Sequence, residues 1–201
     1  MSRETPSQKL TDYVREKGMI RACELDALAI PRVYLSRLVK QGTLERVNRG
    51  LYQMAGADIT EHFTLVQTAK IIPNGVICLL SALSFHGFAT QLPFQVWIAV
   101  ERGKWEAGTK DLPLRIFEFS GKSFQEGIET HTVQGGEVRV YGPAKTVADC
   151  FKYRNKIGLD VALEALRECQ REKKCTSDDV WHFAKVCRVS NVMRPYMEAM
   201  V

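Results

Sequence analysis

The sequence lacks the features that would place the protein in a membrane or a secretory pathway. Its most apolar run, at residues 76–83, is far too short to span a bilayer. The N-terminus is polar and has no apolar segment of the kind found in secretory signals. We therefore expect a cytoplasmic globular protein without membrane contact, a class for which 45% apolar and 25% charged residues are ordinary values.

The six cysteines include no C-x-x-C pair. In a reducing compartment such residues usually act as buried small hydrophobes or as surface thiols. The alternative is a metal site built from Cys169, Cys175, His182 and Cys187, but these spacings match no usual zinc motif. We expect neither a metal nor another cofactor.

Motifs of several catalytic classes are also missing. A restriction-type nuclease needs Glu-x-Lys on a strand to hold a metal, and residues 101–104 and 118–122 have the wrong spacing. A nucleotidyltransferase needs a Gly-Ser turn followed by paired carboxylates, and no such pattern occurs. His86 and His131 fit structural positions better than catalytic ones. The sequence predicts a protein that is not an enzyme.

Positive charge is concentrated near the N-terminus. Residues 1–54 hold ten Lys and Arg against six Asp and Glu, whereas residues 55–201 hold eighteen against seventeen. A local excess of this kind is typical of modules that bind polyanions. It also suits a role in solubility, so the charge alone does not decide between the two.

Helix signals begin this basic segment. Ser7 is expected to cap a first helix that ends near Lys17, before Gly18. An extended segment at residues 19–21 and a short helix at residues 23–28 should follow. These elements would form the first part of a small helical domain.

A third helix and a hairpin complete the segment. Pro31 fits the first turn of a helix that runs to Gln41, and Gly42 fits the left-handed position after it. Strands at residues 44–47 and 51–54 should pair as a hairpin. This order of elements is typical of a winged helix-turn-helix, which we place at residues 1–56.

The third helix would present a basic face. Leu35, Leu38 and Val39 fall on one side and would pack into the domain. The opposite side and the hairpin carry groups suited to DNA bases and phosphates. The predicted DNA-contacting residues are Arg32, Val33, Ser36, Arg37, Lys40, Arg46, Asn48 and Arg49. The alternative is a solvated basic face on a domain that only packs.

Residues 57–201 have the pattern of a larger α+β domain with a mixed or antiparallel sheet and C-terminal helices. Residues 55–60 look like a linker, and Ser81 is expected to cap a short helix. The other expected helices cover residues 61–72, 143–153, 159–172, 177–187 (capped by Ser177) and a segment after residue 190. The expected strands cover residues 76–80, 95–100, 114–119, 128–133 and 137–141.

Four stretches, taken in order, resemble a known family. They are LSRLVKQGTLERVNRGLYQM, SALSFHGF, LPFQVWIAV and VRVYGPAKTVADCFKYRNKIGLDVALEALRE, within about residues 8–172. The chain is similar to AbiEi-type antitoxins, the transcriptional regulators of bacterial abortive-infection toxin–antitoxin operons. Lys145 departs from the pattern, because the family's P-A-R-T stretch has arginine there. Lysine keeps the positive charge but lacks the planar guanidinium with which arginine makes bidentate contacts.

The resemblance implies a winged helix-turn-helix that binds inverted repeats in double-stranded operator DNA and represses its own operon, a phage-defence system. It also implies a C-terminal domain that counters a co-encoded nucleotidyltransferase-like toxin without a stable complex, as type IV antitoxins do. Lys145 and Asp149, one helical turn apart, either mark a surface needed for antitoxicity or belong to a helix start that caps and packs. Two other functions stay open: a nuclease-like protein targeted by the winged module, and a ligand-sensing DNA-binding protein.

Overall fold

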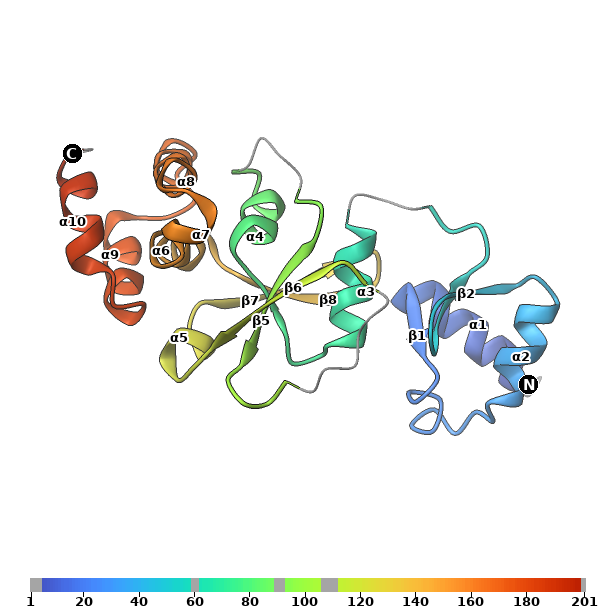
Figure 1. The fold of residues 1–201 in the computed structure, drawn as a ribbon. Helices are drawn as coiled ribbons and strands as arrows, with labels where there is room; N and C mark the ends of the chain where they lie inside the picture. The colour runs from blue at the N-terminus through green and yellow to red at the C-terminus, as the bar shows by residue number, and fades with distance from the viewer. Residues whose placement is uncertain (1–4, 59–61, 89–92, 106–111, 200–201) are drawn as a thin grey trace. The chain divides into compact units, whose positions relative to one another are not determined.

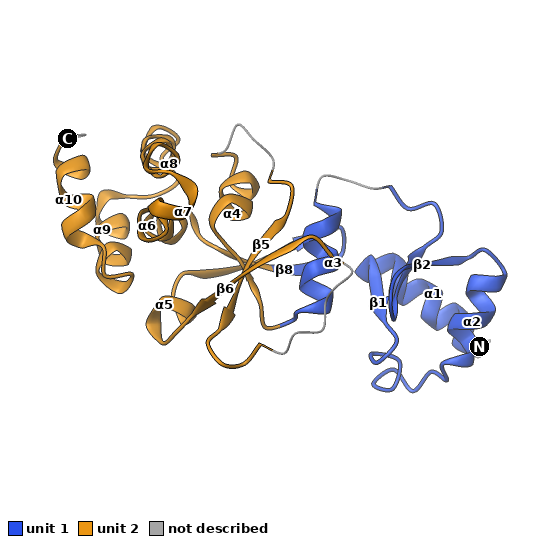
Figure 2. Cartoon of the chain, in the orientation of Figure 1, with its two compact units in different colours: residues 1–73, 132–138 blue, residues 74–131, 139–201 orange. Residues whose placement is uncertain are grey.

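The computed structural model describes residues 5–58, 62–88, 93–105 and 112–199 (Figure 1). The end of the predicted linker and the predicted helix start at residue 61 lie outside these ranges. The chain divides into two compact units, residues 1–73 with 132–138 and residues 74–131 with 139–201 (Figure 2). Helices and sheets occur together in the chain, so the fold class is α+β, as predicted.

The first unit combines three helices with a small antiparallel sheet. The sheet has the order β1-β3-β2, and Met19 pairs with Gln53 across β1 and β3. Its core is formed by apolar residues of both helices and strands, among them Leu10, Val14, Ile20 and Leu35. The elements are α1 (Pro6–Lys17), β1 (Met19–Arg21), α2 (Val33–Lys40), β2 (Leu44–Asn48), β3 (Leu51–Met54) and α3 (Phe63–Ile71).

Two predictions for the start of the chain are wrong. Thr5, not Ser7, caps α1: its hydroxyl accepts a hydrogen bond from the backbone N–H of Gln8, and the Gln8 side chain accepts one in return. Residues 22–29 form turns instead of a helix. Their backbone bonds span three residues, as from Leu28 N–H to the Leu25 carbonyl at 3.1 Å. Leu25 is nevertheless fully buried.

The turn at residues 134–136 packs closely against the end of α1. Gly18 and Gly135 both have positive φ, at 74° and 77°. A Cβ atom on Gly18 would collide with the Gln134 carbonyl, and one on Gly135 would collide with the Glu16 carbonyl. Glycine is therefore required at both positions by conformation and by the close approach of two backbones.

The second unit is built on a mixed sheet with strand order β6-β5-β4-β8-β7. β5 runs parallel to β6 and antiparallel to β4, and β4 runs parallel to β8. The strands are β4 (Val76–Ile77), β5 (Val96–Glu101), β6 (Leu114–Phe119), β7 (Ile128–Val133) and β8 (Gly136–Tyr141). Strands β6 and β7 have the predicted bounds, whereas β4 is shorter than predicted.

Helix α6 is the centre of this unit. All residues from 144 to 151 are buried, because α6 packs on α4, α8 and α9. Pro143 occupies its first turn, as predicted. The helices are α4 (Leu79–Phe85), α5 (Lys122–Gln125), α6 (Pro143–Lys152), α7 (Arg154–Ile157), α8 (Leu159–Arg171), α9 (Ser177–Val186) and α10 (Ser190–Glu198). The short helices α5 and α7 were not predicted.

Two predicted helix caps in this unit are wrong. Helix α4 begins at Leu79, and the Ser81 hydroxyl instead accepts a hydrogen bond from the Trp97 backbone N–H at 2.9 Å. Helix α9 is capped by Thr176, whose hydroxyl accepts from the Asp179 N–H at 3.1 Å. Both helices exist near their predicted positions, but their first turns are set by other contacts.

Cys169 and Cys175 form a disulfide across the turn after α8. The expectation of thiols at these positions is wrong, and the alternative metal site loses two of its four ligands. Cys78, Cys150 and Cys187 are buried thiols, in line with the other expectation for cysteines here. No helix in the described part of the chain is long and apolar enough to cross a membrane.

Candidate nucleic-acid interface

Helix α2 has one buried face and one exposed face. Leu35 and Leu38 are only 3% and 4% exposed and hold the helix on the core of its unit. Val33 on the other face is 58% exposed, an unusual value for a large apolar side chain. The remaining predicted contact residues of this face, Arg32, Ser36, Arg37 and Lys40, are all exposed. The sequence pattern therefore predicted correctly which face of α2 is open to solvent.

Two arginines of this face have neighbours that position them. The Arg37 guanidinium carbon lies 5.1 Å from the centre of the Tyr34 ring, a cation–π contact within one turn of α2. Arg32 donates to the Asp26 carboxylate at 3.0 Å. Exposed ion pairs contribute little stability, so Arg32 can exchange this carboxylate for a phosphate at small cost. The sequence did not predict that Tyr34 positions Arg37, although the two residues are three positions apart, as neighbours on one helix face are.

The turn of the β2–β3 hairpin is shaped by its own polar groups. The Asn48 side chain accepts a hydrogen bond from the Arg49 backbone N–H at 2.6 Å, and Arg46 donates to the Asn48 carbonyl at 3.1 Å. The β-ladder shifts register between Arg46 and Asn48, and Gly50 has a φ of 71°. Asn48 is half-buried and occupied by the turn, whereas Arg46 and Arg49 are exposed.

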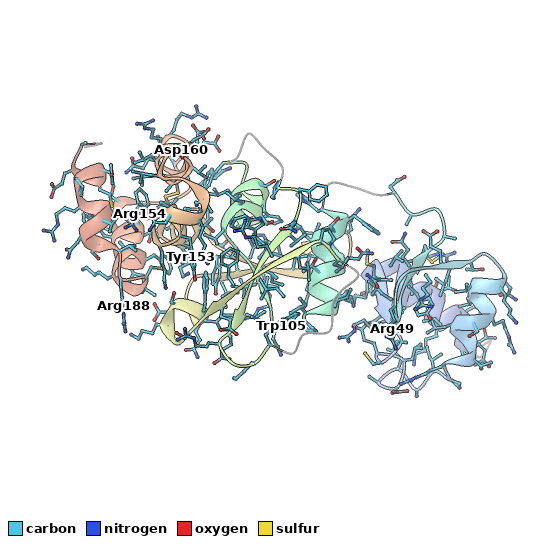
Figure 3. The ribbon with its side chains drawn as sticks, viewed as in Figure 1. Arg49, Trp105, Tyr153, Arg154, Asp160 and Arg188 are labelled. Atoms are coloured by element: carbon cyan, nitrogen blue, oxygen red, sulfur yellow. A yellow bond between two sulfur atoms is a disulfide. The ribbon has the colours of Figure 1, made fainter. Side chains whose placement is uncertain are left out.

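Arg49 lies at the turn end of the hairpin, away from α2 (Figure 3). The connection explains this placement: β2 starts just after α2 and leads away from it, so residues near Leu44 are close to the helix and residues near Arg49 are not. The predicted contacts thus form two cationic places on one unit, the open face of α2 and the tip of the hairpin.

Apart from Arg32, which pairs with Asp26, the cations of these two places have no carboxylate partner in the described ranges. The sequence has no acidic residue from 27 to 44. Within the described ranges, Arg37, Lys40, Arg46 and Arg49 have no carboxylate within ion-pair distance. Other acidic groups of the same unit contact side chains away from these two places, in the pairs Asp12–Arg15, Glu16–Lys17, Glu24–Lys70 and Glu45–Gln53. The surface therefore keeps a positive potential that suits a polyanion.

Lys145 and Asp149 lie in α6 with no exposed surface at all. They cannot form an exposed surface, so the structure favours the alternative in which they pack inside the domain. Burial raises the pKa of the Asp149 carboxyl, and the neighbouring Lys145 ammonium acts in the opposite direction. Burial also raises the pKa of the Cys187 thiol, to about 12, so the thiol is protonated at neutral pH. A need for Lys145 and Asp149 in antitoxicity stays a prediction.

A small pocket lies inside the first unit. It has a volume of about 150 Å³ and is lined by residues that include Gly18, Gln53, Phe63 and Val66. Pockets that hold drug-sized ligands usually measure about 300–1,000 Å³, so this one is too small for most metabolites. In the described ranges, no group of three or more His, Cys, Asp or Glu side chains is placed to hold a metal.

The first unit is therefore a small helical domain with an antiparallel sheet, and its cationic helix face and cationic hairpin tip suit a nucleic acid. Residues 8–55 of this unit match the model of a family described as a transcriptional regulator, AbiEi antitoxin. The match confirms, for this segment, the resemblance predicted from the sequence. The N-terminal segment is thus related to antitoxins that regulate transcription. No curated protein matches the chain.

Proposed function

We propose that the protein is a DNA-binding transcriptional autorepressor and antitoxin of a type IV toxin–antitoxin operon. In this proposal residues 1–56 are a winged helix-turn-helix, with α2 as the recognition helix and the β2–β3 hairpin as the wing. Residues 57–201 are a non-enzymatic antitoxin domain, and the protein acts in the cytoplasm. The observation that carries the proposal is the exposed face of α2 inside the family-matched segment, on which Arg37 and Lys40 have no carboxylate partner among the described residues.

The dimensions of the first unit support binding to duplex DNA. Helix α2 has eight residues and is therefore ~12 Å long, about the width of the major groove. Strand β2 leads away from α2 for five residues, which at ~3.3 Å each gives ~16 Å. Half a helical turn of DNA measures about 17 Å. With α2 in the major groove, Arg49 would reach the phosphates beside the neighbouring minor groove.

The toxin part of the proposal rests on the resemblance and on the family's description as an antitoxin. It holds that the larger domain counters a co-encoded nucleotidyltransferase-like toxin without a stable complex. Regulation and antitoxicity would then be separable, because the α2 face lies outside that domain.

Binding to the DNA upstream of the protein's own gene tests the regulatory part. We expect tighter binding to this duplex than to a shuffled duplex of equal length, with an Arg37→Ala/Lys40→Ala variant losing most of the difference. Arg15→Ala is the matched control, since Arg15 is an exposed cation of the same unit that pairs with Asp12. Equal affinity for both duplexes would contradict sequence-specific regulation, and Mg²⁺-dependent cleavage would favour the nuclease alternative.

Co-expression with the neighbouring toxin gene tests the antitoxin part. Growth should be restored by the wild type and by the Arg37→Ala/Lys40→Ala variant alike, while repression of a reporter is lost only in the variant. Co-purification of the two proteins as a stable complex would contradict the type IV mode.

A further inference from the structure

A cation–aromatic surface lies at the β6 edge of the larger sheet, in the second unit. Arg115 of β6 pairs in register with Trp97 of β5, and its guanidinium carbon lies 4.3 Å from the Trp97 ring centre. Trp97 in turn stacks on Phe117, with ring centres 5.1 Å apart and planes 22° from parallel. Trp97 and Phe117 are each only 5% exposed, whereas Arg115 is exposed. The guanidinium therefore covers the two rings and turns its other face to solvent.

Two lysines extend this surface along β6. Lys156 Nζ lies 5.6 Å from the ring centres of both Phe117 and Tyr153. Lys152 Nζ lies 5.7 Å from the Phe119 ring centre and donates to the Ser123 hydroxyl at 3.2 Å. Both lysines are exposed, and Figure 3 shows Tyr153 between the α6–α7 helices and the sheet. Three cations from a strand and two helices thus converge on one row of aromatic rings.

The neighbouring acidic groups do not neutralise these cations. Glu118, Glu101 and Glu126 pair with other exposed cations, at Arg102, Lys104 and Lys122. Within the described ranges, no carboxylate lies within ion-pair distance of Arg115, Lys152 or Lys156. Cation–π contacts hold the three charges in place while leaving their hydrogen-bond donors available to an anion.

We propose that Arg115, Lys152, Tyr153 and Lys156 bind a single-stranded segment of nucleic acid. One unpaired base stacks on the open face of the Arg115 guanidinium, and the two lysines bind the phosphates that follow. Arginine planes are recurrent stacking platforms for unpaired bases, and lysines supply the sequence-independent attraction to the backbone. A duplex cannot use this platform, because its bases are already stacked on each other. The site is separate from the duplex-binding face proposed for α2.

Fluorescence anisotropy with labelled oligonucleotides of about eight nucleotides, a usual length for such sites, tests the proposal on the full chain. The probes are a mixed-sequence RNA strand, the DNA strand of the same sequence, and the corresponding duplex. In the full chain with Arg37→Ala/Lys40→Ala, which removes the duplex-binding face proposed for α2, we expect tighter binding of a single strand than of the duplex. The difference between the RNA and DNA strands shows whether the 2′-hydroxyl contributes.

Substitutions separate stacking from charge. Arg115→Lys keeps the charge and removes the plane, and it should weaken single-strand binding about tenfold, near the lower end of the usual contribution of one stacked base. Lys152→Gln/Lys156→Gln should weaken it and make its salt dependence shallower. Lys122→Gln is the matched control, since Lys122 is exposed and paired with Glu126, and it should change little. Arg37→Ala/Lys40→Ala should leave single-strand binding intact, which separates this site from the proposed operator site.

Several results would overturn the proposal. The first is an Arg115→Lys variant that unfolds at the wild-type temperature and binds single strands as tightly as the wild type. The second is equal weakening by Lys122→Gln. The third is no preference for single strands over duplex in the chain that carries Arg37→Ala/Lys40→Ala. Complete competition by an acidic peptide at equal charge concentration would assign the surface to an acidic protein instead.

Discussion

Lys145 and Asp149 form a wholly buried ion pair one turn apart in α6, with Nζ and Oδ2 at 2.5 Å. The ammonium also lies 4.1 Å from the Tyr141 ring centre, and the Cys187 thiol donates to the other carboxylate oxygen at 3.2 Å. Both charges are therefore satisfied inside the core, which is the condition under which a buried pair is tolerated. Removing one partner breaks that condition.

Asp149→Ala should destabilise the protein by about 3–5 kcal/mol, because it leaves a buried ammonium without a counter-charge. The double substitution Lys145→Met/Asp149→Leu should cost clearly less than the sum of the two single changes. Urea unfolding followed by circular dichroism measures the free energy of unfolding of the wild type, Lys145→Met, Asp149→Leu and the double variant, with Asp149→Ala beside them. If the losses in the free energy of unfolding of the two single variants add up to that of the double variant, the two charges do not stabilise each other.

The same cycle bears on antitoxicity. Loss of protection in Lys145→Ala/Asp149→Ala would by itself reflect unfolding, because both side chains are buried. If a well-folded Lys145→Met/Asp149→Leu variant also fails to protect cells from the toxin, the pair has a functional role beyond packing.

Arg37→Ala should weaken binding to the operator by about 1–3 kcal/mol, the usual contribution of a bidentate contact to a base. The loss on random duplex should be smaller. Titration of both duplexes at one salt concentration decides the matter, with Arg15→Ala as the control. An equal loss on both would assign Arg37 to phosphate, and no loss on either would remove α2 from the interface.

Arg49→Ala should leave thermal stability nearly unchanged and should weaken binding to all duplexes alike. Arg49 is exposed and has no carboxylate partner in the described part of the chain, so the fold gains little from its charge. A phosphate contact releases condensed counterions, so its loss should reduce the slope of log K against log salt by about one unit. A slope equal to that of the wild type would exclude a phosphate contact at the hairpin tip.

The stability of the second unit should fall in mild acid because of His86. Burial lowers the pKa of this imidazole, and the nearby His131 and Lys174 act in the same direction. The Tyr141 carbonyl, 2.8 Å from Nε2, and Glu129 oppose the shift. The unfolded chain then binds a proton at a higher pH than the folded one. Stability should be constant above about pH 6.5 and decline below it, until the folded imidazole is also protonated.

Urea midpoints at pH values from about 8 to about 5 measure this decline. His86→Gln keeps a donor for the Tyr141 carbonyl and should flatten the decline, whereas His182→Gln, at an exposed histidine, should not. A steeper decline in His86→Gln would contradict the assigned direction.

Sequence periodicity predicted the elements whose burial follows a regular pattern. Strand β6 at residues 114–119 and the start of α6 at Pro143 agree with the structure because each depends on local signals. The open face of α2 was predictable for the same reason. The helix predicted at residues 23–28 does not form, since six residues are too few to sustain a helix without packing. There the backbone turns back, with Ile30 N–H bonded to the Leu25 carbonyl at 3.0 Å.

Other features depend on contacts between distant residues and left no local signal. Lys145 can be buried because Gly127, with a φ of 79°, leaves the space that its side chain fills. Ser81 does not cap α4, since its hydroxyl is bound to Trp97. The contact between Arg115 and Trp97 requires the parallel pairing of β5 and β6, which spacing along the chain cannot specify. The predicted boundary at residue 56, between the DNA-binding domain and the antitoxin domain, stays a prediction.

The turn at residues 134–136 limits how regulators of this kind can be recombined. The chain passes between its two compact units at residues 73–74, 131–132 and 138–139, so the first unit is not a contiguous N-terminal segment. A fragment that ends at residue 73 lacks the turn against which Gly18 is closely packed. If the first unit binds an operator as proposed, exchanging it for the unit of another regulator would require exchanging residues 132–138 together with the first 73. The first unit is thus encoded by two separate pieces of sequence, and a single crossover would separate them.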